Sequence, residues 1–518
     1  MSDLIRKVME DSCREFADIP AVKWLVKKDI KERKYSELFE NLTAIRKGLV
    51  AEGFEGKHIA FIGGSSVWWI EGYLGVVTGR MTAVPLDTAL PAEELTDLIN
   101  RSDSEGIFLD VDRKDMVETI IASCPAVRKI WMLTEEASDD TSADEKVETL
   151  GDLEKAGVGD ADGEEPEPDD LAMILFTSGT TGKSKGVMLT QNNMAANLEA
   201  MSFSTAPGVV LLNVLPVHHA FCLVMDWLRG LARGAVICVN DSLMHMVRNM
   251  GIFKPHAMLM VPLMIETVFK RINAVKDPEK RMETAQQIFG GRLRYIFTGG
   301  AHLDEYYLEQ FREMDIKVLE GYGMSECSPV ISANTPVAFK YGSVGKPLPN
   351  VEISFSDEGE ILVKGTSVMK QYYRMPEETS EALREGWLHT GDKGYMDEDG
   401  FLFINGRIKN LIILSNGENV SPEEMENKLA LCPLIAEVVV VGIKNGLAAV
   451  VYPDKDVVEA RKLEPEAVRE GIQDYIDEFN RSQPSYRAII RLELRDQPFE
   501  RSSTKKIKRN LVTLDENN

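Results

Sequence analysis

Short apolar strands alternate with helical stretches along most of this chain, and this alternation constrains the fold more than any other feature. Runs such as "HIAFIG" and "TAVPL" are apolar and only five or six residues long, which is typical of buried strands. Between them lie longer stretches of helical character such as "WWIEGYLGVVTG". Strands that alternate with helices predict parallel sheets whose faces are covered by helices, so we expect an α/β fold.

The pattern changes twice toward the C-terminus. From about Gly342 onward, short strands with the turn signals "DEG" and "EDG" predict antiparallel hairpins and therefore a β-rich subdomain. After Arg407, the strands "EVVVVGI" and "LAAVVY" and a charged helix near residues 466–480 predict a small α+β domain. A chain of 518 residues is too long for one core. We therefore expect a large N-terminal domain of helix-covered sheets over residues 1–406, and a C-terminal domain over residues 407–518.

Charge and cysteine usage restrict the partners and the compartment. The formal net charge of −24 disfavours nucleic acid or an anionic membrane as the main partner. The six cysteines are scattered with no CxxC pair, which argues against a zinc site or a disulfide framework and favours a reducing compartment, with cytoplasm as the default. The N-terminus has no apolar signal core, and no apolar run is long enough to span a membrane. An acidic stretch over residues 134–170 predicts a solvated, mobile connector.

The stretch "TSGTTGKSKG", residues 177–186, follows the predicted strand "LAMILF" and has the composition of a phosphate-binding loop. It contains three glycines, five hydroxyl side chains and two lysines. Glycines let backbone N–H groups turn toward an anion, and hydroxyls and lysines add hydrogen bonds and charge. It contains "GKS" (182–184), the sequence that ends a Walker A loop, but Thr177 stands where that motif requires glycine. The alternative for this stretch alone is a surface turn.

Four further stretches accompany this loop in a fixed order. They are "GYGMSE" (321–326), "HTGD" (389–392), "GRIKN" (406–410) and "SSTKKIKR" (502–509). With the loop, their order and spacing resemble the adenylate-forming (AMP-binding) superfamily of acyl-CoA synthetases, carrier-loading adenylation domains and luciferases, over essentially the whole chain. The resemblance implies an AMP-forming ligase that uses ATP and Mg²⁺ to convert a carboxylate into an acyl-adenylate, with CoA as the acceptor.

The resemblance also implies roles for individual residues. It assigns nucleotide binding to Thr177, Ser178, Gly179, Thr180, Thr181, Lys185, Gly300, Ala301, Gly321, Tyr322, Gly323, Ser325, Asp392, Arg407 and Lys506. Tyr322 would stack on adenine, and Asp392 would accept hydrogen bonds from the ribose. Glu326 would coordinate Mg²⁺, a hard cation suited to carboxylate oxygens, and Thr177 would share it. Lys506 would bridge the attacking carboxylate and the α-phosphate, and it is predicted as catalytic together with His219 and Arg407.

A mobile C-terminal domain is a further implication of the resemblance. In this family the domain swings between two poses, one for adenylate formation and one for thiolation. The hinge would lie at Lys409, and Gly417 would let a pantetheine arm pass close to the backbone. The sequence departs from the usual family pattern at Ser184, Asn410 and Lys505.

The segments that would line the acyl pocket indicate which class of carboxylic acid is the substrate. In "LPVHHAFCL", His219 stands at the family histidine and His218 at a position often held by an aromatic gate, while Gly300 and Ala301 would form another wall. No carboxylate follows His219 to pair a substrate ammonium, so amino-acid activation is disfavoured. The methionine-rich segment "FKPHAMLMVP" and the ending "STKKIKR" resemble the long-chain fatty-acyl branch.

Three functions remain open at this point. The first is a ligase that joins a medium- or long-chain fatty acid to CoA, with small-molecule substrates and at most peripheral membrane contact. The second is an adenylate-forming enzyme that loads an acyl carrier protein. The third, a non-catalytic nucleotide or acyl-chain sensor, is disfavoured by the presence of Lys506, Glu326, Asp392 and Arg407.

Overall fold

A computed structural model describes most of the 518 residues. The described residues are 4–135, 144–159, 161–177, 183–201, 206–275, 277–414, 418–444, 446–501, 507–512 and 514. The chain folds into two compact units. The first comprises Met1–Ala301, Tyr306–Glu352 and Val363–Leu388, and the second comprises His302–Glu305, Ile353–Leu362 and His389–Asn518.

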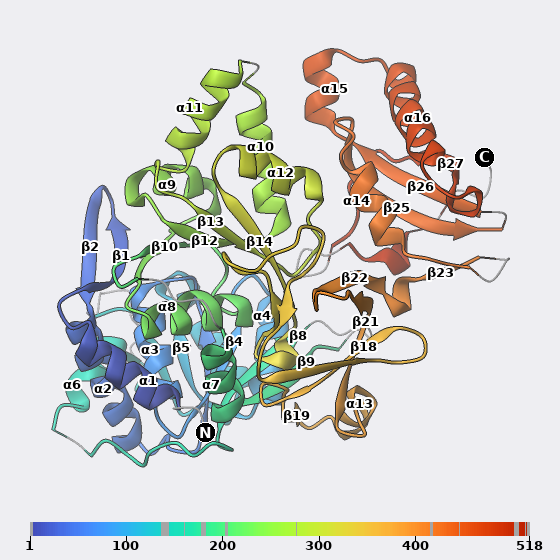
Figure 1. Ribbon diagram of the computed structural model, residues 1–518. Coiled ribbons are helices and arrows are strands. Elements are labelled where there is room, and N and C mark those ends of the chain that lie inside the picture. Colours follow the sequence, from blue (N-terminus) through green and yellow to red (C-terminus); the bar gives the residue numbers. More distant parts are fainter. Residues whose placement is uncertain are drawn as a thin grey trace. The chain divides into compact units, whose positions relative to one another are not determined.

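A nine-stranded sheet forms one half of the first unit (Figure 1). In spatial order its strands are β16 (Lys346–Pro347), β15 (Val330–Ala333), β14 (Lys317–Gly323), β13 (Tyr295–Thr298), β12 (Ala257–Met260), β10 (Val210–Asn213), β11 (Val236–Val239), β1 (Pro20–Val26) and β2 (Asp29–Lys34). The strands from β14 to β1 pair in parallel, and the outer pairs are antiparallel. Every residue of β11 and β12 is buried, as expected for parallel strands covered on both faces.

An eight-stranded sheet forms the other half of the first unit. In spatial order its strands are β19 (Gln371–Tyr372), β9 (Lys185–Thr190), β8 (Leu171–Thr177), β4 (Thr82–Leu86), β3 (His58–Ile62), β5 (Ser104–Leu109), β6 (Lys129–Met132) and β7 (Val147–Thr149). The strands from β8 to β7 are parallel, whereas β9 is antiparallel to both β8 and β19. The predicted strand "TAVPL" is β4, residue for residue.

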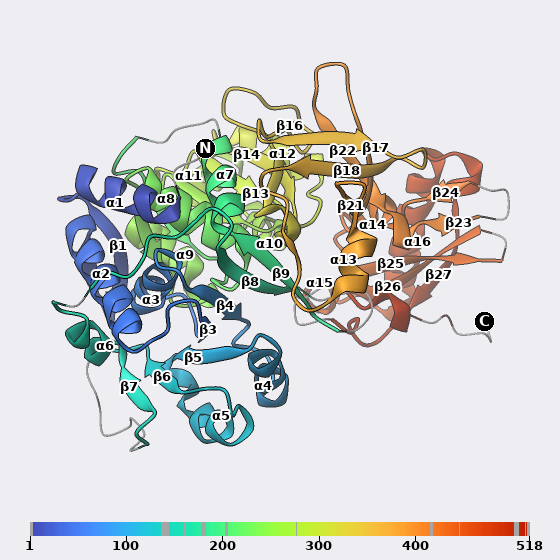
Figure 2. The same ribbon diagram turned by 90° about the horizontal axis from the view of Figure 1, so that it is seen from below.

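Helices cover both sheets. They are α1 (Ile5–Glu15), α2 (Tyr35–Ala51), α3 (Val67–Val77), α4 (Ala92–Arg101), α5 (Val117–Ser123), α6 (Leu150–Ala156), α7 (Gln191–Ala200), α8 (Arg229–Ala232), α9 (Met246–Phe253), α10 (Pro262–Asn273), α11 (Pro278–Ile288), α12 (Glu305–Glu313) and α13 (Pro376–Ala382). Figure 2 shows α4 and α5 beside β5 and β6, with which they share one apolar core. The predicted helix "WWIEGYLGVVTG" is α3, which begins where the Ser66 hydroxyl accepts a hydrogen bond from the Trp69 N–H.

A five-stranded sheet follows along the chain. Its strands are β17 (Val351–Phe355), β18 (Glu360–Gly365), β21 (Trp387–Met396), β20 (Leu383–Arg384) and β22 (Leu402–Arg407). The turn "EDG" joins β21 to β22 in an antiparallel hairpin, and "DEG" lies between β17 and β18. The β-rich part predicted from these turn signals is therefore confirmed.

The C-terminal part of the second unit is a small α+β structure. It contains β23 (Ile412–Ile413), β24 (Asn419–Val420), β25 (Ile435–Ile443), β26 (Gly446–Pro453) and β27 (Ile489–Leu494), with helices α14 (Pro422–Leu429), α15 (Lys455–Arg461) and α16 (Pro465–Arg481). Figure 1 shows α14 and α16 beside β25–β27, and these elements share one apolar core. In α16 the buried residues Val468, Ile472 and Ile476 recur every four positions, so one face of this charged helix meets the core.

The acidic stretch differs from its prediction. Within its described residues, β7 joins the eight-stranded sheet and α6 follows it directly. The Asp162 carboxylate then accepts hydrogen bonds from Nε and Nη2 of Arg46 at 2.8 and 2.9 Å, and from Arg6 at 2.6 Å. Because the Arg46 side chain is fully buried, this ion pair fixes the backbone there. The described part of the stretch therefore contains regular structure and an ion pair to a buried arginine that a mobile connector would lack, while most of its side chains are exposed or partly exposed, as predicted.

No helix among the described residues is long and apolar enough to cross a membrane.

Candidate active site

The predicted phosphate loop joins β8 to β9. Thr177 ends β8 and Lys185 begins β9, and the two residues pair across the hairpin. Ser178, Gly179, Thr180 and Thr181 lie outside the described residues.

The end of the loop is fixed by α4, because Nη2 of Arg101 donates to the carbonyl oxygen of Ser184 at 2.6 Å. The Arg101 guanidinium also lies 5.5 Å from the centroid of the Phe176 ring. Arg101 was not predicted as a site residue, because it lies 83 residues before Ser184 in the chain.

One tyrosine connects the predicted metal ligand to the base of the phosphate loop. The Tyr372 hydroxyl donates to Oε1 of Glu326 at 2.8 Å, and Nζ of Lys185 lies 4.9 Å from the Tyr372 ring centroid. Burial raises the pKa of Tyr372 above its ordinary value, and the neighbouring Glu326 charge raises it further, so the hydroxyl stays protonated and donates. Glu326 is itself buried. Tyr372 was not predicted as a site residue, because nothing in "QYYRMPEET" distinguishes it from a packing tyrosine.

The residues around Glu326 fit a magnesium ion that is held mainly by substrate. Among the described residues there is no group of three or more His, Cys, Asp or Glu side chains that could hold a metal ion. Mg²⁺ usually keeps several waters and binds proteins through one or two carboxylates together with substrate phosphates. A single buried carboxylate whose Oε1 is oriented by a neutral donor is compatible with that mode of binding.

Two segments that were predicted to bind the nucleotide lie at one edge of the nine-stranded sheet. Gly300 and Ala301 follow β13, and the "GYG" stretch over residues 321–323 ends the neighbouring parallel strand β14. Ser325 and Glu326 follow in a short 3-10 helix, Ser325–Cys327. A Cβ on Gly323 would lie 2.0 Å from the carbonyl oxygen of Pro329, so this position requires glycine. Ligands of open α/β sheets bind at the carboxyl ends of parallel strands, which is where these residues lie.

The predicted acyl-pocket histidines lie at the same edge, after β10. The rings of His218 and His219 have centroids 4.3 Å apart, and Nε2 of His218 lies 3.8 Å from Oδ1 of Asp87. Burial and the neighbouring His219 lower the pKa of His218 to about 4 against the opposing effect of Asp87, so His218 is neutral at pH 7. A π-helix, Phe221–Leu228, begins directly after them. Asp87 was not predicted, because it comes from the other sheet of this unit, after β4.

In the second unit, the two predicted ribose ligands contact each other. Asp392 on β21 and Arg407 on β22 are cross-strand partners, and Nε of Arg407 lies 2.9 Å from Oδ1 of Asp392. The Asp392 side chain is 8% exposed and that of Arg407 is 48% exposed, so a buried carboxylate is paired with a guanidinium that solvent can reach. Glu360 holds the adjoining "HTGD" turn by accepting from the Gly391 N–H at 2.9 Å and lying 2.7 Å from Nδ1 of His389.

The predicted hinge and lysine segments also lie in the second unit. Lys409 is in the short 3-10 helix Ile408–Asn410, while Gly417 and Lys506 fall outside the described residues. Arg501 and Ile507, on either side of the lysine segment, pair in an antiparallel bridge.

The residues after the lysine segment are anchored to α14. Arg509 forms ion pairs with Glu426 and Glu423, and Glu423 also accepts a hydrogen bond from the Asn410 amide at 2.6 Å. Glu423 therefore contacts both the predicted hinge segment and the end of the predicted catalytic motif.

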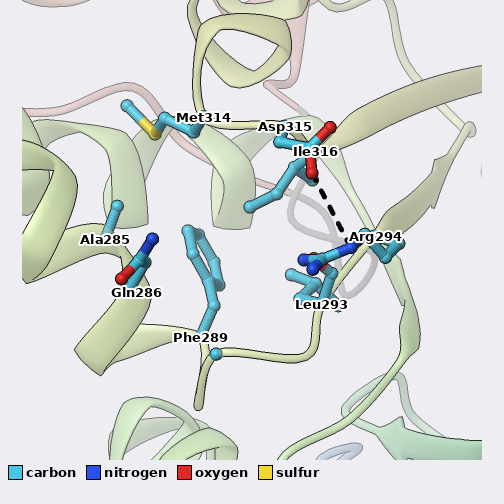
Figure 3. A pocket seen from close by; sticks show the side chains of 9 residues that line it. Ala285, Gln286, Phe289, Leu293, Arg294, Met314, Asp315 and Ile316 are labelled. Atoms are coloured by element: carbon cyan, nitrogen blue, oxygen red, sulfur yellow. Dashed lines mark hydrogen bonds and ion pairs between the residues drawn. The ribbon is translucent and has the colours of Figure 1, made fainter.

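A cavity of about 100 Å³ lies elsewhere in the first unit, among α11, the segment between α11 and β13, and the segment between α12 and β14 (Figure 3). Phe289, Leu293, Met314 and Ile316 supply apolar lining, and Arg294 and Asp315 pair at 3.8 Å beside them. None of the predicted site residues lines it, so the assignment of the site rests on the side-chain contacts above.

Comparison with known families agrees with this arrangement. The family described as AMP-binding enzyme matches residues 9–373, and the AMP-binding enzyme C-terminal domain matches residues 409–515. The chain therefore belongs to the AMP-binding enzyme family, whose members are adenylate-forming.

Relatives within the family include enzymes named as ligases of long-chain fatty acids and CoA. The chain is 29% identical over 521 residues to long-chain-fatty-acid–CoA ligase 5 of Rattus norvegicus, covering 88% of this chain and 75% of that protein. It is 28% identical over 473 residues to long-chain-fatty-acid–CoA ligase FadD15 of Mycobacterium tuberculosis, covering 82% and 78%. It is thus similar over most of its length to adenylate-forming ligases.

Solved structures share the fold over nearly the whole chain. The adenylation domain of a carboxylate reductase from Mycobacterium chelonae aligns with a TM-score of 0.83 at 22% identity, covering 98% of this chain and 89% of that one. ATP-bound MatB from Rhodopseudomonas palustris aligns with a TM-score of 0.78 at 25% identity, covering 99% and 98%. The expected fold class, with a large N-terminal part and a smaller C-terminal part, is confirmed.

Proposed function

We propose that this protein joins a medium- or long-chain fatty acid to CoA at the expense of ATP, releasing AMP and pyrophosphate. The observation that carries the proposal is the set of contacts from Lys185 through Tyr372 to Glu326. Through these contacts, the predicted phosphate-binding Lys185 and the predicted metal ligand Glu326 both touch the side chain of Tyr372 in the first unit. The relatives named as long-chain fatty acid ligases support the choice of acid.

The reaction would proceed in two steps. An oxygen of the fatty carboxylate attacks the α-phosphorus of ATP, a P–O bond forms, and the bond to pyrophosphate breaks. The CoA thiolate then attacks the acyl carbon, and AMP leaves with the electron pair of the broken C–O bond. Bound Mg²⁺ would supply positive charge to the phosphate oxygens.

The protein's own groups have separate tasks in the first step. Lys185 and the hydroxyls of the phosphate loop bind the β- and γ-phosphates, and Glu326 binds the metal. Asp392 accepts from the ribose hydroxyls, and Arg407, which the ion pair to Asp392 orients, donates to the ribose and phosphate region. Lys506 neutralises charge at the reacting phosphorus and carboxylate.

The histidine pair suits an apolar acyl chain. The depressed pKa of His218 means that it adds no positive charge to the pocket wall at pH 7. A neutral imidazole is less costly to leave beside a hydrocarbon chain than a charged one. Each methylene that the pocket buries contributes about 0.8 kcal/mol, so the depth of the pocket would set the preferred chain length.

Product mass spectrometry with Mg-ATP and a mixture of straight-chain acids, with and without CoA, tests the proposal. We expect acyl-CoA only when CoA is present, with one range of chain lengths enriched. Acyl-adenylate that accumulates unchanged in both reactions would mean that an acyl carrier protein is the true acceptor. Absence of both products, with nucleotide still bound, would favour the non-catalytic sensor.

A further inference from the structure

We propose that Tyr372 is a positioning residue that orients Glu326 for a divalent cation through its hydroxyl and Lys185 for ATP phosphates through its ring. This inference rests on the proposed function, because it concerns the same metal and nucleotide. The hydroxyl donates to Oε1 of Glu326 at 2.8 Å, and Nζ of Lys185 lies 4.9 Å from the ring centroid. One side chain thus contacts both groups that the first step would require.

The backbone around Tyr372 is fixed independently of these two contacts. Strand β19 pairs with β9, so Tyr372 lies opposite Val187, two residues beyond Lys185. The Tyr372 N–H donates to the Thr379 hydroxyl at 3.0 Å, and the Met369 N–H donates to the carbonyl oxygen of Glu326 at 2.7 Å. The segment before Tyr372 is therefore tied to Glu326, and Tyr372 itself is tied to the strand that carries Lys185.

The hydrogen bond from the Tyr372 hydroxyl orients the carboxylate of Glu326, the proposed metal ligand. A buried carboxylate with no donor at one oxygen would rotate or bind water there, and its direction toward the cation would vary. The Tyr372 hydroxyl donates to Oε1 and thereby restricts the rotation of the carboxylate. Removal of such a supporting hydrogen bond typically weakens metal binding by about 10- to 100-fold.

The ring contact acts on the lysine. A lysine ammonium over an aromatic face is attracted by the ring quadrupole, and the face excludes some of the positions that the four-carbon side chain would otherwise occupy. Because Lys185 begins β9, this contact holds its ammonium at the end of the phosphate loop. The hydroxyl and the ring can be removed separately, so the two roles predict different phenotypes.

Binding of Mn²⁺ in place of Mg²⁺ gives a readout that does not depend on catalysis. Free Mn²⁺ is measured by electron paramagnetic resonance in the presence of α,β-methylene-ATP, which cannot form an adenylate. We expect Tyr372→Phe to raise the Kd for Mn²⁺ by about 10-fold or more. Tyr372→Leu, which also removes the ring, should in addition weaken binding of the nucleotide by about 3- to 10-fold.

The neighbouring tyrosine provides a matched control. Tyr373 is in the same segment, but its hydroxyl donates to Oδ2 of Asp103 at 2.5 Å rather than to Glu326. Tyr373→Phe removes the same atom from the adjacent residue, and we expect it to leave Mn²⁺ binding within two-fold of the wild type. An equal effect of both substitutions, or no effect of Tyr372→Phe, would overturn the proposal.

A double substitution separates positioning from general destabilisation. In a Glu326→Gln background there is no carboxylate to orient, so Tyr372→Phe should change the residual Mn²⁺ Kd by less than two-fold. If Tyr372→Phe raises the Kd for Mn²⁺ by the same factor in both backgrounds, its effect does not act through Glu326 and the proposal fails. Circular dichroism melts of each variant establish that all of them are folded.

The binding assay also distinguishes this inference from the proposed function. If the wild type binds Mn²⁺ and nucleotide but activates no fatty acid, the proposed reaction is wrong while the role of Tyr372 can still be measured. If the wild type binds Mn²⁺ no more tightly with the nucleotide than without it, the inference about Tyr372 is refuted directly.

Discussion

The buried carboxyl of Asp226 should make the stability of the first unit depend on pH, and its removal should make the protein more stable at neutral pH. Asp226 lies in the π-helix after His219 and is completely buried. The Asn213 amide donates to Oδ2 at 2.8 Å, whereas Oδ1 has no hydrogen-bond partner among the described residues. Burial raises the pKa of Asp226 from 3.8 to about 7, against the lowering effect of the Asn213 hydrogen bond.

The size of the effect follows from this shift. The folded state holds its proton up to about pH 7, whereas the unfolded state releases it near pH 3.8. The contribution of Asp226 to stability is therefore fully present below pH 3.8, and it is lost as the pH rises through the pKa of the folded state. The difference between a pKa of 3.8 and one of about 7 corresponds to 1.36 kcal/mol per pH unit, so the free energy of unfolding falls by on the order of 4 kcal/mol above pH 7.

Asp226→Asn removes this titration while it keeps the shape of the side chain. The amide oxygen can accept from Asn213, and the neutral side chain avoids the cost of a buried, unpaired charge. We expect urea unfolding, followed by tryptophan fluorescence, to show an advantage of the variant over the wild type that grows between pH 5 and pH 8. The first unit contains the buried Trp69 and Trp227 as reporters.

Asp152→Asn is the matched control. The Thr149 hydroxyl and backbone lower the pKa of Asp152, so its stabilising contribution is lost only as the pH falls through that lowered value. Its effect should be destabilising and constant from pH 5 to pH 8. An Asp226→Asn advantage that is likewise constant over this range, or a loss of stability at pH 8, would refute the reasoning.

Three other changes have defined outcomes. Lys506→Ala should abolish acyl-adenylate formation but leave thioester formation from preformed acyl-adenylate nearly unchanged, and equal loss of both half-reactions would contradict its assigned role. Arg509→Gln should slow adenylate formation about 10-fold or more, measured by pyrophosphate exchange, because Arg509 anchors the lysine segment to Glu426. Asp162→Asn should lower the free energy of unfolding by about 2 kcal/mol, since it weakens the hydrogen bonds to buried Arg46; an unchanged urea midpoint would show that this contact is dispensable.

The secondary structure and the order of the motifs could be predicted because both are local properties of the sequence. The apolar run of β4 ends before the polar residues Asp87 and Thr88, and the turns "DEG" and "EDG" adjoin the predicted strands. A strand needs only a handful of consecutive residues to show its character. The assignment to the family followed from five such local signals taken in order.

The contacts that complete the site could not be predicted, because each joins residues far apart in the chain. Tyr372 and Glu326 are 46 residues apart, and the pairing of β19 with β9 that places Tyr372 has no sequence signal of its own. The acidic stretch shows the same limit. Its composition indicates exposure to solvent, but it gives no sign of the ion pair between Asp162 and the buried Arg46, which lies 116 residues earlier in the chain.

The pairing of Asp392 with Arg407 bears on how a ribose would bind. Nε of Arg407 lies 2.9 Å from Oδ1 of Asp392, so the guanidinium restricts the orientation of the carboxylate. The ion pair also compensates the charge of a largely buried carboxylate before a nucleotide binds. Because the Arg407 side chain is half exposed, its remaining N–H groups stay available to a ligand. The pair thus resembles the contact between Tyr372 and Glu326, because in each a donor orients an acidic side chain.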